Sequence, residues 1–172
     1  GDSLLAVLHG LSATEIATLE IDCFLTGGTL VSIHAGDAPG LEALWSEVQV
    51  NPAAASGTAD VLLARLADVL TRRLMSVLDE FEDVVDALIE MALTADQRTI
   101  GEVTAIRSDL TAVRRVVHPQ RETLDRLRSS TSPLITDEGR RRFSDVFDLA
   151  DRASTELITA RSRTFSSSRI FP

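Results

Sequence analysis

Acidic side chains are the residues of this sequence whose type and spacing could do chemistry. In the stretch RRFSDVFDLADRASTEL (141–157), Asp145 stands between Phe143 and Phe147. At about 100° per residue, the apolar residues of this stretch fall on one side of a helix and Asp145 falls on the other. Carboxylate oxygens are ligands for hard divalent cations, but most acidic residues on helices form only a solvated face. The pattern by itself leaves both interpretations open.

A second acidic group is DEFEDVVDALIE (79–90), which carries six carboxylates. A solvated face with partial pairing to Arg is the more common role of such a run, and weak, diffuse attraction of cations is the alternative. Asp68, in LLARLADVLTRR, has few other acidic residues near it in sequence. Its type alone indicates no particular role.

The motifs of common catalytic and metal centres are absent. His9, His34 and His118 are far apart and form neither an HxxxH nor an HExxH pair, and the chain has no CxxC, no GxSxG and no Gly-rich loop after a strand. The single cysteine, Cys23, alternates with polar neighbours as a buried strand residue does. We therefore predict no enzyme activity.

Composition limits the classes of partner. The net charge of −9 argues against nucleic acid, because phosphate binding requires clustered positive charge. A hydrophobic content of 44% in 172 residues is sufficient for one packed core. No segment approaches the roughly 18 apolar residues of a membrane span, so we expect a soluble polypeptide.

Periodicity divides the chain into three parts of one structural domain. Residues 1–57 are β-rich: 3–10 forms a strand, and 18–26 and 29–35 form a hairpin around Gly27 and Gly28. A short helix follows, opened by Pro39, with one apolar face made of Leu41, Leu44, Trp45 and Val48.

Residues 58–134 read as two long amphipathic helices joined by a turn at 94–97, which makes an antiparallel hairpin. Residues 135–172 begin with Thr136, which can cap a third long helix whose first turn holds Asp137 and Glu138. The predicted fold class is α+β: a small sheet with a short helix, then a long helical hairpin, then a C-terminal stalk helix.

The helical part resembles the CorA family of divalent-cation channels. The features that carry the resemblance come in the family's order: paired Arg114 and Arg115, then Pro119 with x-Arg-Glu-x-x-Leu, then a short loop and the aromatic-x-Asp-Val-aromatic-Asp segment of 143–148. The strands and the acidic helix that precede them also come in the expected order. The similarity covers nearly the whole chain.

The resemblance implies a regulatory role for two carboxylates. In the family, intracellular Mg²⁺ binds between the cytoplasmic domains of neighbouring identical subunits of a homopentamer and favours the closed pore. The aspartate of the aromatic-x-Asp-Val motif takes part in this binding, and it corresponds to Asp145. In some members an aspartate on the first hairpin helix also lies near that region, and it corresponds to Asp68. Phe143 and Phe147 would then anchor the stalk helix in its own subunit, while Asp145 faces the neighbour. Mg²⁺ is thus the implied ligand, and divalent cations and identical subunits are the implied partners.

The resemblance also implies parts that the sequence lacks. Two transmembrane helices with a Gly-Met-Asn motif would follow the stalk, and an upstream segment would supply further ligands. We therefore expect a soluble fragment of an inner-membrane protein, located on the cytoplasmic side and attached to the membrane only through the missing helices.

Three functions remain open at this stage. The first is the regulatory domain of a Mg²⁺ or Co²⁺ channel. The second is the same domain of a Zn²⁺-transporting relative of the ZntB type. The third is a helical interaction module with no role in transport.

Overall fold

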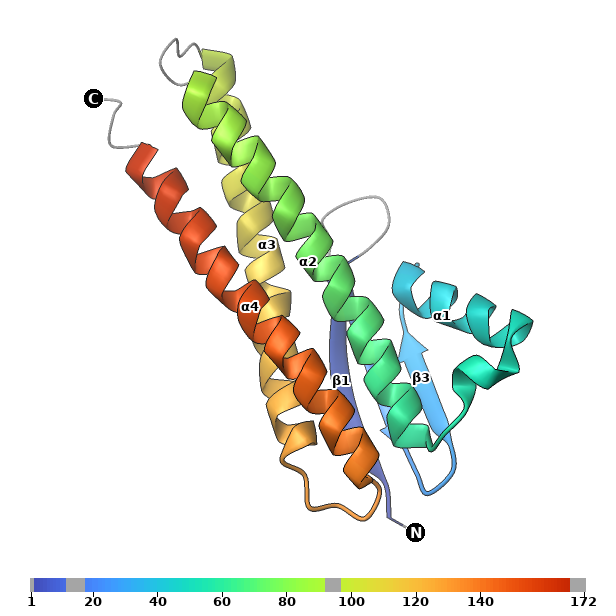
Figure 1. Cartoon of the computed structure of the whole chain (residues 1–172). Helices are drawn as coiled ribbons and strands as arrows, with labels where there is room; N and C mark the ends of the chain where they lie inside the picture. Colours follow the sequence, from blue (N-terminus) through green and yellow to red (C-terminus); the bar gives the residue numbers. More distant parts are fainter. Residues whose placement is uncertain (1, 12–17, 92–96, 168–172) are drawn as a thin grey trace.

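The computed structural model describes residues 2–11, 18–91 and 97–167. Three strands come first in the chain, followed by a short helix, a single 3₁₀ turn and three long helices. The three long helices run side by side, and the sheet lies against the lower half of the first two (Figure 1). This arrangement confirms the predicted α+β class.

The sheet is antiparallel, with strands β1 (Leu4–Leu11), β2 (Thr18–Leu25) and β3 (Leu30–His34) in that order. The predicted hairpin between β2 and β3 is confirmed, and the N–H of Thr26 donates to the carbonyl of Thr29 at 2.9 Å across the turn. Period-two alternation decides which side chains are inward. The inward side chains of β1 and β2 are buried: Ala6, Leu8, Leu19, Ile21, Cys23 and Leu25.

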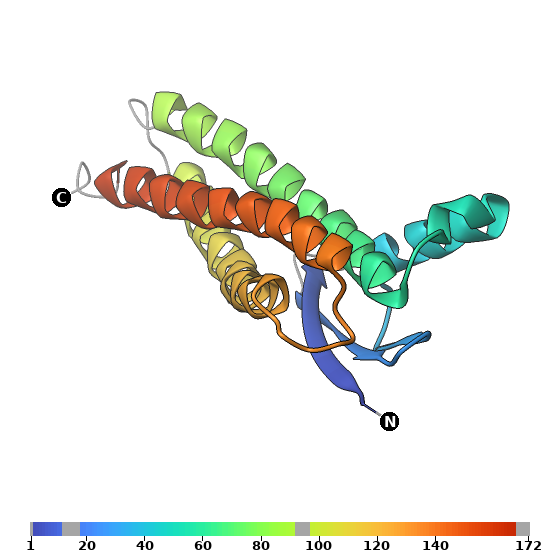
Figure 2. The same ribbon diagram turned by 60° about the horizontal axis from the view of Figure 1, so that its bottom comes forward.

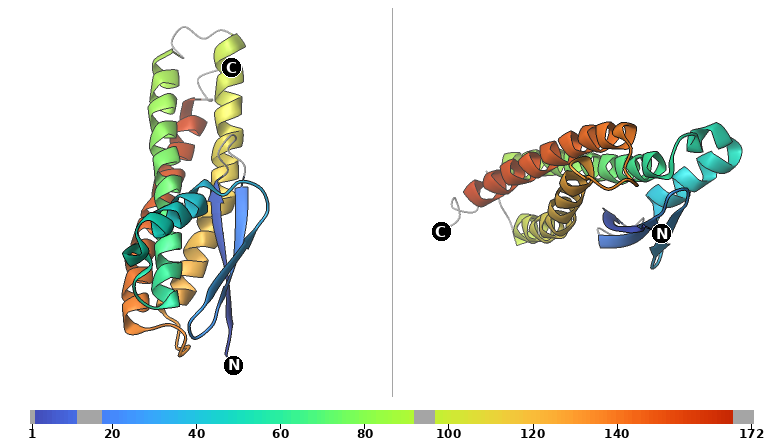
Figure 3. Two further views of the ribbon diagram at one scale, coloured as in Figure 1. Left: turned by 90° about the vertical axis from the view of Figure 1, so that its right-hand side faces the viewer. Right: turned by 90° about the horizontal axis from the view of Figure 1, so that it is seen from below.

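Helices cover only one face of this sheet. All four α-helices lie on the same side of it, as Figure 2 and the right view of Figure 3 show. On the opposite face the register aligns Leu5 with Phe24 and Phe24 with Val31. These three side chains and Ile33 are exposed.

Helix α1 (Pro39–Val50) packs against α2 with only part of its predicted apolar face. Leu44 is buried and Leu41 and Val48 are partly buried, but Trp45 is 63% exposed. Trp45 lies 100° around the helix from Leu44, at the edge of the stripe. The side of α1 that carries Gly40 and Leu44 faces α2 and is buried, and the opposite edge of the apolar face, with Trp45, is left exposed. A 3₁₀ turn, Pro52–Ala55, then connects α1 to α2.

The long helices are α2 (Ala59–Met91), α3 (Gln97–Arg128) and α4 (Asp137–Ser167). Helices α2 and α3 form the predicted antiparallel hairpin, and α4 runs beside α2 in the same direction (Figure 1). The turn predicted at 94–97 lies, except for Gln97, outside the described residues. The predicted cap of α4 is confirmed, because the N–H of Gly139 donates to Thr136 Oγ1 at 3.0 Å.

Two polar side chains of α3 attach the hairpin to the free edge of β1. Gln120 is fully buried; its Oε1 accepts the backbone N–H of His9 at 2.8 Å and its Nε2 donates to Thr71 Oγ1 of α2 at 3.3 Å. Thr123 Oγ1 donates to the carbonyl of Val7 at 3.2 Å. An edge strand presents unpaired backbone groups, and these two side chains satisfy one donor and one acceptor.

Candidate metal centre

Asp145 lies on the exposed side of α4, as its position opposite the phenylalanines predicts. Phe143 is fully buried, and Val146 and Phe147 are buried beside it. Rotation of α4 about its axis would bring these side chains into water, at about 1.5–3 kcal/mol for each large apolar group. The core thus fixes the direction in which Asp145 points.

Asp68 lies on α2 and is engaged by a neighbour on its own helix. Arg72 Nε donates to Asp68 Oδ2 at 2.8 Å, and the Asp68 side chain is 33% exposed. This hydrogen bond and the charge of Asp68 raise the pKa of Arg72. Because exposed ion pairs of this kind contribute at most about 1 kcal/mol, a cation that needs the Asp68 carboxylate has only a weak competitor.

The two aspartates stand at the same level of neighbouring helices. Helices α2 and α4 run in the same direction (Figure 1), and their first turns are joined by hydrogen bonds from Thr136 to Asp60. Asp68 follows Asp60 by eight residues and Asp145 follows Thr136 by nine. At 1.5 Å per residue these steps are about 12 Å and about 13.5 Å.

The described residues of a single chain do not bring together enough side chains to form a complete metal site. Across residues 2–11, 18–91 and 97–167, no three or more His, Cys, Asp or Glu side chains come together as a group that could hold a metal ion. Of the acidic run 79–90, the side chains of Asp79, Glu80 and Asp83 are exposed, and those of Glu82, Asp86 and Glu90 lie outside the description.

Asp60 is a functional candidate that the pattern of the sequence did not reveal. It is 2% exposed, and its Oδ2 accepts both the backbone N–H and the hydroxyl of Thr136, each at 2.8 Å. Burial acts to raise the pKa of Asp60, but hydrogen bonds from Thr58 and Thr136 outweigh it and hold the pKa below its usual value. Its place in the first turn of a helix, two residues after a threonine, was the only signal.

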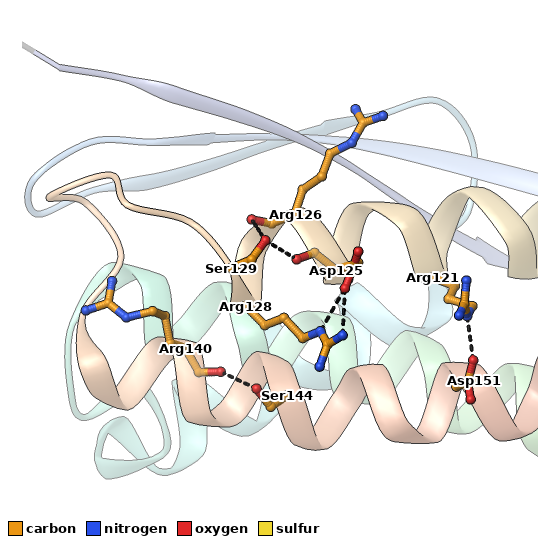
Figure 4. Close-up of polar contacts among 8 residues, drawn as sticks. All are labelled: Arg121, Asp125, Arg126, Arg128, Ser129, Arg140, Ser144 and Asp151. Carbon is orange, nitrogen blue, oxygen red and sulfur yellow. Dashed lines mark hydrogen bonds and ion pairs between the residues drawn. The ribbon is translucent and has the colours of Figure 1, made fainter.

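The Pro-x-Arg-Glu segment serves the contact between α3 and α4. Arg121 Nε donates to Asp151 Oδ1 at 2.6 Å (Figure 4). The guanidinium of Arg121 lies 5.1 Å from the ring centre of Phe147. Arg128 lies 3.8 Å from the same ring centre and also donates to Asp125. Two arginines of α3 thus contact the aromatic segment of α4.

The histidines and the cysteine occupy separate places. His9, on β1, has a pKa lowered by burial and partly restored by Glu20 on the neighbouring strand. His34 is exposed at the end of β3, and His118 is exposed on α3, 3.5 Å from Glu122. Burial raises the pKa of the Cys23 thiol to about 12. Cys23 thus behaves as the small buried hydrophobe that the alternation predicts.

Hydropathy gives no membrane span among the described helices: each is too short or too polar in every window.

Known proteins resemble this chain along nearly its whole length. The model of the family described as "CorA-like Mg2+ transporter protein" matches residues 1–168. A curated relative, the zinc transport protein ZntB of Yersinia enterocolitica, is 23% identical over 170 residues, which are 95% of this chain and 51% of the relative. The chain thus spans about half the length of that protein.

Solved structures share the fold. The soluble domain of CorA from Methanocaldococcus jannaschii aligns with a TM-score of 0.88 at 20% identity, over 98% of this chain and 69% of that one. The ZntB cytoplasmic domain from Vibrio parahaemolyticus aligns with a TM-score of 0.82 at 17% identity, over 98% and 68%. With the family model matched over residues 1–168, this chain belongs to the family of CorA-like Mg²⁺ transporter proteins and has the fold of their soluble domains.

Proposed function

We propose that this chain is the cytoplasmic regulatory domain of a CorA-type divalent-cation channel, in which Mg²⁺ binds between neighbouring identical subunits at Asp145 and Asp68. The observation that carries the proposal is the exposed carboxylate of Asp145, held outward by the buried Phe143 and level with Asp68. Family membership supports a role in cation transport, and the position of Asp145 supports a site that faces another molecule.

A site shared by two copies fits the chemistry of Mg²⁺. This ion keeps several of its water molecules and is bound through one or two carboxylates. Two acidic surfaces brought together repel one another unless a cation lies between them. Bound Mg²⁺ would hold the subunits together, and its loss would loosen the interface and release the pore.

In the longer protein, α4 would begin the stalk that leads to the membrane. We place this domain on the cytoplasmic side of the inner membrane, in a homopentamer that conducts Mg²⁺ or Co²⁺. Transport of this kind requires no catalytic residues, which agrees with the lack of catalytic motifs in the sequence.

Zn²⁺ is the alternative ion, because the Yersinia enterocolitica relative is named a zinc transport protein. The donors of the candidate site favour Mg²⁺. Both are carboxylates, and hard oxygen ligands suit Mg²⁺, whereas imidazole and thiolate are the usual ligands of Zn²⁺. This argument applies to the regulatory ion at Asp145 and Asp68. The identity of the conducted ion requires a transport measurement.

The test uses the full-length protein that contains this chain, digested by a protease over a range of Mg²⁺ concentrations. We expect Mg²⁺ to slow cleavage, and Asp145→Asn to raise the concentration for half-protection about tenfold, which is about 1.4 kcal/mol. Asp68→Asn should shift it in the same direction. Asp148→Asn, at another exposed carboxylate of α4, is the matched control and should leave it unchanged.

Equal protection of Asp145→Asn and the parent protein would refute the proposed site. Protection by micromolar Zn²⁺ with none by Mg²⁺ would favour the zinc alternative. A protein that neither ion protects would be better described as a helical interaction module.

A further inference from the structure

The first turns of α2 and α4 share one buried carboxylate. Asp60 is the second residue of α2, and its Oδ2 accepts two hydrogen bonds from Thr136, the capping residue of α4. The bonded residues are 76 positions apart in the chain. This contact is a direct polar link between the start of the hairpin and the start of α4.

The hydrogen bonds form a directed relay. The N–H of Gly139 donates to Thr136 Oγ1, and the Thr136 hydroxyl donates onward to Asp60 Oδ2. Asp60 must therefore accept at this oxygen. A Cβ at position 139 would lie well inside van der Waals contact with the same oxygen, so a larger residue there would displace the Asp60 carboxylate or the turn that carries position 139.

Electrostatics explains why a carboxylate suits this position. Helices α2 and α4 run in the same direction and begin side by side (Figure 1), so their partially positive N-terminal ends lie together. The negative charge of Asp60 compensates both ends at once. Hydrogen bonds from Thr58 and Thr136 also lower the pKa of Asp60, so it carries this charge at neutral pH.

The acidic residues in the first turn of α4 form ion pairs within α4. Asp137 and Glu138 are exposed, and they pair with Arg140 and Arg142 of their own helix. Both ion pairs lie within α4. Among these three carboxylates, Asp60 is the one that joins two helices.

We propose that Asp60 is a positioning residue that sets the register of α4 on α2, and that it thereby holds Asp145 level with Asp68. The register depends only on contacts within this chain. Its consequence for cation binding rests on the function proposed above. Asp60 itself is buried and acts through the helix that carries Asp145.

The register can be measured directly by the distance between two spin labels, one on each helix. The exposed positions Ser76 and Asp148 accept the labels as Ser76→Cys and Asp148→Cys. Asp60→Asn keeps the side-chain volume and removes the charge, and Gly139→Ala pushes the two turns apart. We expect both changes to broaden the distance distribution or move its maximum. Asp137→Asn, which removes a charge from the same helix end, should leave the distribution unchanged.

The native Cys23 does not interfere with labelling. It is fully buried, and its thiol has a pKa of about 12, so it remains protonated and covered during the reaction. Circular dichroism of each labelled variant confirms that the helices are formed before distances are compared. Gly139→Ala keeps the Asp60 carboxylate, so it tests the register even if Asp60→Asn does not fold.

The outcomes separate this inference from the proposed function. An unchanged distribution in folded Asp60→Asn or folded Gly139→Ala would overturn the positioning role, whatever Mg²⁺ does. A changed distribution together with a raised Mg²⁺ concentration for half-protection in full-length Asp60→Asn would support both. A changed distribution in a protein that Mg²⁺ never protects would keep the positioning role and reject the regulatory site.

Discussion

Replacement of Gln120 by methionine should destabilise the protein, because Gln120 connects three elements from inside the core. Its Oε1 accepts the backbone N–H of His9 at 2.8 Å, and its Nε2 donates to Thr71 Oγ1 at 3.3 Å. Methionine has a similar volume, so Gln120→Met leaves no large cavity. The change isolates the lost polar contacts.

The magnitude follows from the groups left behind. The His9 N–H, on the edge of β1, loses its partner, and an unsatisfied buried donor costs about 1–3 kcal/mol. The Thr71 hydroxyl keeps its bond to the carbonyl of Ala67 at 2.8 Å, so its loss is small. A loss of about 2 kcal/mol corresponds to a Tm lower by about 4–8 °C for a chain of this length.

The assay is urea unfolding followed by far-UV circular dichroism. Trp45 is already 63% exposed in the folded chain, which makes its fluorescence a poor probe of unfolding. Gln49→Met, at an exposed position of α1, is the matched control and should change the free energy of unfolding by less than about 0.5 kcal/mol.

Amide exchange of His9 gives a local measurement of the same bond. We expect faster exchange at this amide in Gln120→Met than in the parent chain. A variant with the parent's urea midpoint and the parent's His9 protection would refute the argument that Gln120 satisfies the edge of β1.

Two further predictions follow from burial and charge. Phe143→Ala should lower the free energy of unfolding in urea by about 3–5 kcal/mol, because Phe143 is fully buried. Phe24→Ala, at a residue that is 40% exposed, should lower it much less, and equal losses would contradict the assignment of the core. Since the pKa of Asp60 is lowered in the folded chain, its contribution to stability is present above its unfolded pKa of about 3.9 and is lost as pH falls through the lower, folded value. The unfolding midpoints of the parent and Asp60→Asn should therefore differ at pH 7 and converge in acid, and a difference independent of pH would show that the charge of Asp60 is not involved.

Local pattern was sufficient to predict most of the elements. Alternation over 18–26 predicted a strand with Ile21 and Cys23 on one face, and both are buried in β2. Apolar spacing of three and four predicted the long helices, and Thr136 marked the start of α4. The outward direction of Asp145 also follows from the sequence, because the core must take Phe143 and Phe147 from the opposite side of the same helix.

Only the tertiary structure decided which apolar faces are covered and which polar side chains are buried. Periodicity placed Trp45 on the apolar face of α1, but which side of that face is buried depends on where α2 lies. Asp60 and Gln120 are buried because their partners, Thr136 and His9, come from positions 76 and 111 residues away. A buried polar group is stable only with such partners, and no local pattern contains them.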